Sequence, residues 1–179
     1  MCDHMHVVTG GPGSGKSSLI EALSRRVIST VPEAGRAIIR DQMLIDGPAL
    51  PWADRAAFAE QMLGWELRSH REAALRAEPV IFDRGVPDVI GYLTLCKLPV
   101  ADHIGEAARL FRYNRRVFLA PFWPEIFTHD AERKQHLAEA KATCEAMRET
   151  YRSLGYELVD LPCTSVEERA DFVLERLGG

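Results

Sequence analysis

The stretch TGGPGSGKSS, residues 9–18, decides the fold of this chain. From Gly10 to Ser17 it matches the pattern G-x-x-x-x-G-K-[ST]. An apolar run at residues 6–9 predicts a short strand before the stretch, and apolar residues at helical spacing predict a helix over residues 17–28. A glycine-rich stretch with this pattern, between a strand and a helix, is typical of a phosphate-binding loop, or P-loop.

The residues of this loop predict a nucleotide site. Glycines let successive backbone N–H groups curl around a phosphate, and the following helix directs the positive end of its dipole at that phosphate. Lys16 can reach the β- and γ-phosphates, and the Ser17 hydroxyl can bind Mg²⁺. A glycine-rich turn with an exposed lysine is the structural alternative. The residues expected to hold the nucleotide are Gly10, Gly11, Pro12, Gly13, Ser14, Gly15, Lys16, Ser17 and Ser18.

The kind of nucleotide is indicated by a motif that the sequence lacks. GTPases that are specific for guanine usually read the base with N/T-K-x-D, and the sequence has no such motif. We therefore expect ATP and Mg²⁺ as the cofactors.

A second metal ligand is predicted at the end of another strand. Residues 80–83, VIFD, form an apolar run that ends in Asp83, as expected of a strand buried on both faces. In P-loop proteins a carboxylate at such a position binds the metal, directly or through water. Arg84 follows and can stabilise the charge of a phosphoryl group in transfer, or pair with a neighbouring carboxylate.

Composition excludes several classes of protein. The chain has 179 residues, 46% of them hydrophobic and 27% charged, and a net charge of -4, which suits one domain over residues 1–179. Without a Lys/Arg block, nucleic-acid binding is not expected. The sequence shows neither an apolar run of membrane-spanning length nor a secretory signal, so we expect a cytoplasmic protein.

The remaining sequence alternates strands with helices. Further strands are predicted at residues 29–31, 117–121 and 157–161, and helices at 54–77, 88–97, 101–113, 132–154 and 165–177. This alternation predicts an α/β fold in three layers, with a parallel sheet, right-handed crossovers and helices on both faces.

Two further stretches carry a family resemblance, VPEAGRAIIRD at residues 31–41 and VIFDRGVPDVIGYL at residues 80–93. With the loop and the ending SVEERADFVLERL, they resemble the AAA-like P-loop family related to the ribosylnicotinamide kinase domain of bacterial NAD regulators. The resemblance implies a kinase-like P-loop NTPase fold with a five-stranded sheet in the order 2-3-1-4-5. The strand at 29–31 is then at the edge, where Pro32 is tolerated.

The resemblance also implies site residues. In similar kinases an acidic residue after the second strand faces the acceptor hydroxyl, and Glu33 falls there; it could accept the hydroxyl proton, or could pair with Arg36 instead. Asp83 is the competing base. A helical lid is implied at about residues 120–136, with Arg133 over the phosphates and Lys134 as second candidate, although a solvated helix start explains these charges as well.

The sequence says less about the identity of the phosphoryl acceptor. Residues 43–52 are positioned to wall an acceptor pocket, where Trp52, Phe58 or Trp65 could stack on a ring or simply pack in the core. Two functions remain open. The first is an ATP-dependent kinase of a small hydroxylated metabolite, with nucleoside-like molecules among the candidates. The second is a nucleotide-dependent ATPase or switch that binds a protein or lipid partner and has no phosphoryl acceptor.

Overall fold

Within the described residues, 3–26, 28–126 and 133–177, the computed structural model has one parallel sheet of five strands. Their order is β2-β3-β1-β4-β5, which confirms the expected 2-3-1-4-5 arrangement. The strands are β1 (Met5–Gly10), β2 (Ser29–Val31), β3 (Val80–Asp83), β4 (Arg116–Ala120) and β5 (Glu157–Asp160).

The register brings the ends of the two central strands together. In the pairing of β1 with β3, Val8 lies opposite Asp83, so the loop that follows β1 starts beside the carboxylate that ends β3. Every residue of β1 and β3 is buried, as expected of strands covered on both faces. β2 pairs with β3 alone and lies at the edge, which confirms the position inferred for it beside Pro32.

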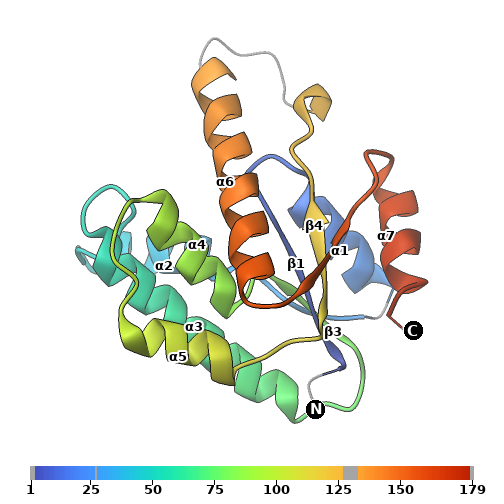
Figure 1. The fold of residues 1–179 in the computed structure, drawn as a ribbon, viewed down its shortest axis with the longest axis horizontal. Helices are drawn as coiled ribbons and strands as arrows, with labels where there is room; N and C mark the ends of the chain where they lie inside the picture. The colour runs from blue at the N-terminus through green and yellow to red at the C-terminus, as the bar shows by residue number, and fades with distance from the viewer. Residues whose placement is uncertain (1–2, 27, 127–132, 178–179) are drawn as a thin grey trace.

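Helices cover both faces of the sheet (Figure 1). On one face, α1 (Lys16–Arg25) packs against α7 (Val166–Leu174), and their apolar residues form one core cluster with Val8 and Phe118. The other face carries α3 (Arg55–Ala74), α4 (Val86–Leu95), α5 (Asp102–Leu110) and α6 (Arg133–Ser153). The three-layer α/β prediction is therefore confirmed.

The capping residues at the starts of α7 and α4 explain where these helices begin, and why α4 begins earlier than predicted. Ser165 and Glu168 form a capping box at the start of α7: Ser165 Oγ accepts from the Glu168 N–H at 3.3 Å, and Glu168 Oε2 accepts from the Ser165 N–H at 3.1 Å. α4 begins at Val86, two residues before the predicted start. Asp88 is the third residue of this helix, where its carboxylate accepts the Gly85 N–H at 2.9 Å.

One helix, α2 (Ala34–Leu44), was not predicted. It buries only Ala34 and Ile38, and its C-terminal end leaves Met43 and Leu44 exposed. A 3₁₀ turn spans Pro124–Ile126 after β4. Across the described residues, no helix combines the length and the apolar character needed to cross a membrane.

Candidate active site

The glycine loop connects β1 to α1 with a backbone that only glycine adopts readily. Gly10 and Gly15 have φ of 137° and 77°. A Cβ atom on Gly10 would lie 2.4 Å from the Ala120 carbonyl oxygen, so the neighbouring strand leaves no room for one. Gly15 is the N-cap of α1, and the first helical residue is Lys16. The unpaired N–H groups of that helix end are thus available to an anion.

Lys16 is held inside the loop. It is buried, and its Nζ atom donates to the carbonyl oxygens of Gly11 at 2.7 Å and Gly10 at 3.1 Å. Burial, together with the positive charge of Arg84, lowers the pKa of Lys16 to about 8. The ammonium group is therefore poorly solvated in this state and would gain from an anionic partner.

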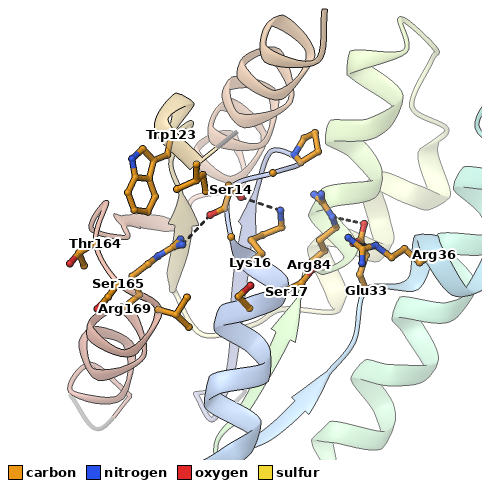
Figure 2. A pocket seen from close by; sticks show the side chains of 16 residues that line it. Ser14, Lys16, Ser17, Glu33, Arg36, Arg84, Trp123, Thr164, Ser165 and Arg169 are labelled. Carbon is orange, nitrogen blue, oxygen red and sulfur yellow. Dashed lines mark hydrogen bonds and ion pairs between the residues drawn. The ribbon is translucent and has the colours of Figure 1, made fainter. Parts of the chain in front are cut away.

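A cavity of about 720 Å³, here called the loop cavity, surrounds the glycine loop. Figure 2 shows Lys16 in its middle, with Trp123, Thr164, Ser165 and Arg169 on one side and Arg84, Glu33 and Arg36 on the other. One end is therefore rich in cations around the loop. The other end offers an aromatic ring, small hydroxyls and the start of α7, a combination that suits a nucleotide base.

Arg169 is a site residue that sequence reasoning missed. It is 2% exposed, and its Nη1 atom donates to the Ser14 carbonyl oxygen at 3.0 Å. Its Nε atom is buried and has no hydrogen-bond partner within the described residues. Arg169 thus braces the glycine loop from α7. The sequence places it four residues after the cap Ser165, which does not distinguish it from an exposed arginine.

Arg84 joins two carboxylates. Its Nε atom donates to Glu33 Oε1 at 3.1 Å, and its Nη1 atom donates to Asp88 Oδ1 at 3.1 Å. The backbone of Arg84 is left-handed, with φ of 77°, a backbone conformation that is rare for arginine. Arg36 is more distant, with Nε 3.9 Å from Glu33 Oε2. Glu33 therefore pairs with both Arg84 and Arg36, and the distance to Arg84 is the shorter of the two.

Asp88 is the anchor of this group and was recognised only as part of a motif. Its Oδ1 atom accepts from the Thr9 hydroxyl at 2.6 Å, and its Oδ2 atom accepts from the Tyr151 hydroxyl at 2.6 Å. With the Gly85 N–H and Arg84, four donors from β1, α6 and the start of α4 converge on one buried carboxylate. This network fixes Arg84, and through it Glu33.

Asp83 and Ser17 fit a magnesium ion. Asp83 is buried, and its Oδ1 atom has no hydrogen-bond partner among the described residues. Burial raises the pKa of Asp83 to about 6, against the opposing charge of Lys16. Asp83, Ser17 and Glu33 line one open groove. The described residues contain no cluster of three or more His, Cys, Asp or Glu side chains suited to a metal. A carboxylate and a hydroxyl suit Mg²⁺, which usually keeps several waters and phosphate oxygens as its other ligands.

A second cavity of about 270 Å³, here called the aromatic cavity, opens beside the first. Its walls are mostly apolar and come from α2, α3, α4 and α6, with Phe58 and Tyr92 among them. The residues that line both cavities are Pro12, Glu33, Arg36 and Arg84. The two spaces therefore meet at the Glu33–Arg84 pair.

The three aromatic residues considered for the acceptor wall lie in different surroundings, and Phe58 and Trp65 also pack in one small core cluster, as the alternative expected. Phe58 lines the aromatic cavity, whereas Trp65 lines the groove beside Asp83 and Trp52 is 63% exposed. Of residues 43–52, Pro51 alone is among the described lining residues. The side chains of Arg133 and Lys134, and residues 127–132 of the predicted lid, lie outside the described part of the chain.

Comparison with known proteins places the chain among P-loop proteins. A family model described as "AAA domain" matches residues 5–169. Over 85 residues the chain is 33% identical to the tRNA modification GTPase MnmE of Maricaulis maris (strain MCS10), a match that covers 46% of this chain and 19% of that protein. The chain thus spans about a fifth of that curated relative.

Solved structures share the whole fold at low identity. Deoxyadenosine kinase from M. mycoides is similar with a TM-score of 0.62 and 11% identity, covering 97% of this chain and 98% of that one. Thymidylate kinase from Ehrlichia chaffeensis gives 0.61 and 12%, with 98% of each chain covered. Shikimate kinase from Acinetobacter baumannii gives 0.52 and 12%, covering 96% and 90%.

Proposed function

The chain belongs to the AAA domain family, whose model matches residues 5–169, and on that premise we propose that it is an ATP-dependent kinase of a small hydroxylated metabolite. The observation that carries this proposal is the junction of the two cavities at Glu33 and Arg84. A nucleotide in the loop cavity would present its γ-phosphate there, and a hydroxyl in the aromatic cavity could approach it from the other side. The solved structures that share this fold include kinases of small molecules.

Each residue around the junction would have a different role in phosphoryl transfer. Lys16 and the backbone N–H groups of the loop would bind the β- and γ-phosphates, which releases Lys16 from the carbonyls of Gly10 and Gly11. Arg84 would stabilise negative charge on the transferring group. Glu33, held by Arg84 at 3.1 Å, would orient the acceptor hydroxyl and accept its proton. Asp83 is the competing base.

Magnesium would be held by Ser17 and Asp83, together with phosphate oxygens and water, and would neutralise charge between the phosphates. ATP is proposed as the nucleotide because the N/T-K-x-D motif is missing from the sequence. The base would lie near Trp123, Thr164 and Ser165, at the far end of the loop cavity. We place the activity in the cytoplasm, where ATP and Mg²⁺ are available, and treat residues 1–179 as one domain with a lid at about 120–136.

The rate of ADP release tests this function. Candidate acceptors of several classes, namely nucleosides, sugars and hydroxy acids, are added to the protein with ATP and Mg²⁺. Acceleration confined to one class, with a phosphorylated product found by mass spectrometry, supports the kinase. A rate that no member of the panel changes would favour the nucleotide-dependent switch instead.

A further inference from the structure

The aromatic cavity contains a buried carboxyl group that the transfer of phosphate does not use. Glu66 on α3 lines the cavity and is 4% exposed. Its Oε2 atom is fully buried and has no hydrogen-bond partner within the described residues. Buried polar atoms in folded proteins are nearly always hydrogen-bonded, so Glu66 brings to the cavity wall a carboxyl group whose hydrogen-bonding capacity is not filled within the described residues.

The surroundings of Glu66 favour the neutral acid. Burial raises its pKa well above the usual range, the negative charges of Asp88, Asp83 and Glu33 act in the same direction, and only the positive charge of Arg84 opposes them. A neutral carboxyl carries both an O–H donor and an acceptor oxygen. It can therefore pair with an uncharged polar group and does not require a cation.

The remaining walls of the cavity suit a flat ring. Phe58 and Tyr92 both line it, and their rings meet edge to face with centroids 5.5 Å apart. Met62 and Val89 add apolar surface. A ring with a polar edge would bury its faces against these side chains and turn the edge to Glu66, while Glu33 and Arg84 remain at the opening to the loop cavity.

We propose that Glu66 selects the acceptor by hydrogen-bonding to the polar edge of a planar heterocycle, so that the acceptor is a molecule of the nucleoside class. This inference rests on the proposed function, because it assigns the aromatic cavity to the acceptor. Its strongest support is the combination of an unsatisfied buried carboxyl and two aromatic rings within a single cavity that joins the phosphate site.

Binding of matched ligands tests the inference without depending on catalysis. Adenosine, inosine, cytidine and uridine are titrated by calorimetry into the protein with saturating ADP, and phenyl riboside, which keeps the sugar but has no polar ring edge, is the reference. The wild-type protein is expected to bind at least one of the four nucleosides about tenfold or more tightly than phenyl riboside, because a buried polar group left unpaired disfavours the apolar ring.

Variants of Glu66 distinguish a hydrogen bond between Glu66 and the ring from a purely structural role of this residue. Glu66→Met, which removes the polar atoms at similar volume, should reduce this preference to about threefold or less and should strengthen binding of phenyl riboside. Glu66→Gln keeps a neutral donor and acceptor and should preserve the preference, which also guards against a folding defect in the Met variant. Glu60→Met is the control, since Glu60 lies exposed on the same helix and pairs with His103.

The two proposals can fail separately. If none of the four nucleosides binds, if phenyl riboside binds equally well, or if Glu66→Met keeps the preference, the assignment of Glu66 is overturned even where ADP release shows a kinase acting on another class. If a nucleoside binds with the expected dependence on Glu66 but receives no phosphate from ATP, the assignment stands and the kinase fails.

Discussion

Arg84 and Glu33 form an ion pair, with Nε 3.1 Å from Oε1, at the place where the loop cavity meets the aromatic cavity. They are 51 positions apart in the sequence, on the segments that follow β3 and β2. Because these strands are neighbours in the sheet, their carboxyl ends bring the two side chains together. The pair thus couples the position expected for the γ-phosphate to that expected for the acceptor.

Replacement of Lys16 by alanine should abolish nucleotide turnover and spare the fold. The ammonium group is buried in the loop, and its loss removes the main cation expected to contact the phosphates, so turnover should fall by about 10²-fold or more. The midpoint temperature of thermal unfolding should be unchanged or slightly higher than in wild type, because burial of this cation is unfavourable. Lys141→Ala, exposed on α6, is the control. Unchanged turnover in the Lys16 variant would refute the site.

Glu33→Gln should slow transfer to the acceptor by about 10²-fold or more and leave the ATP dissociation constant within about threefold of wild type. Glutamine can still accept a hydrogen bond from Arg84 but is a far weaker base. Turnover and calorimetry on the same preparation give both values. A collapse of ATP binding would instead assign Glu33 to the nucleotide.

Gly15 and Arg169 should be energetically coupled. A Cβ atom on Gly15 would lie 2.6 Å from Arg169 Nη1, so Gly15→Ala requires the guanidinium to move from the Ser14 carbonyl. In the Arg169→Met background that conflict is gone and the strain at φ of 77° remains. Urea unfolding of the two single variants and the double variant should therefore show a coupling of about 1 kcal/mol, with the double variant more stable than the sum of the singles predicts. Additive effects would mean that the brace is not formed.

Glu66→Gln should stabilise the protein increasingly as pH rises. Below the ordinary pKa of 4.5, both the folded and the unfolded chain keep the proton of Glu66, so this group does not make stability depend on pH there. Above it the unfolded chain ionises while the folded chain, with its raised pKa, does not. The wild type therefore loses up to about 1.4 kcal/mol of unfolding free energy per pH unit from this one group, until the folded pKa is reached.

Urea unfolding of wild type and Glu66→Gln at pH 5, 6, 7 and 8 measures this difference. The charged groups that act on Glu66, namely Asp88, Asp83, Glu33 and Arg84, are present in both proteins, so the comparison isolates Glu66. A difference that stays constant over this range would show that Glu66 is already ionised in the folded protein.

Much of this architecture is legible in the sequence. The glycine pattern and the two apolar runs that form β1 and β3 predict the centre of the sheet, because completely buried strands are continuous in hydrophobicity. The strand order came from the family resemblance and not from periodicity. α2 was missed although its apolar residues do recur at helical spacing, because its segment was interpreted only through its resemblance to a family motif.

The buried polar side chains around the site could not be predicted, for a different reason. Arg169, Asp88 and Glu66 are polar residues that the tertiary fold buries, and a single sequence gives no sign of which charged residues are buried. Trp52 shows the converse, an aromatic residue expected at a pocket that the fold leaves exposed. The chemistry of the loop is therefore local, whereas the network that positions Arg84 and Glu33 depends on contacts made by β1, α4 and α6.

The fate of the γ-phosphate of ATP tests the junction of the two cavities most directly. The protein is incubated with γ-labelled ATP, Mg²⁺ and the four nucleosides, and the label is separated into phosphorylated acceptor and inorganic phosphate. The sugars and hydroxy acids of the ADP-release panel are included in parallel incubations. We predict that the label appears on an acceptor hydroxyl and that Glu33→Gln suppresses this transfer. Label found entirely in inorganic phosphate, at a rate that no acceptor alters, would contradict the account.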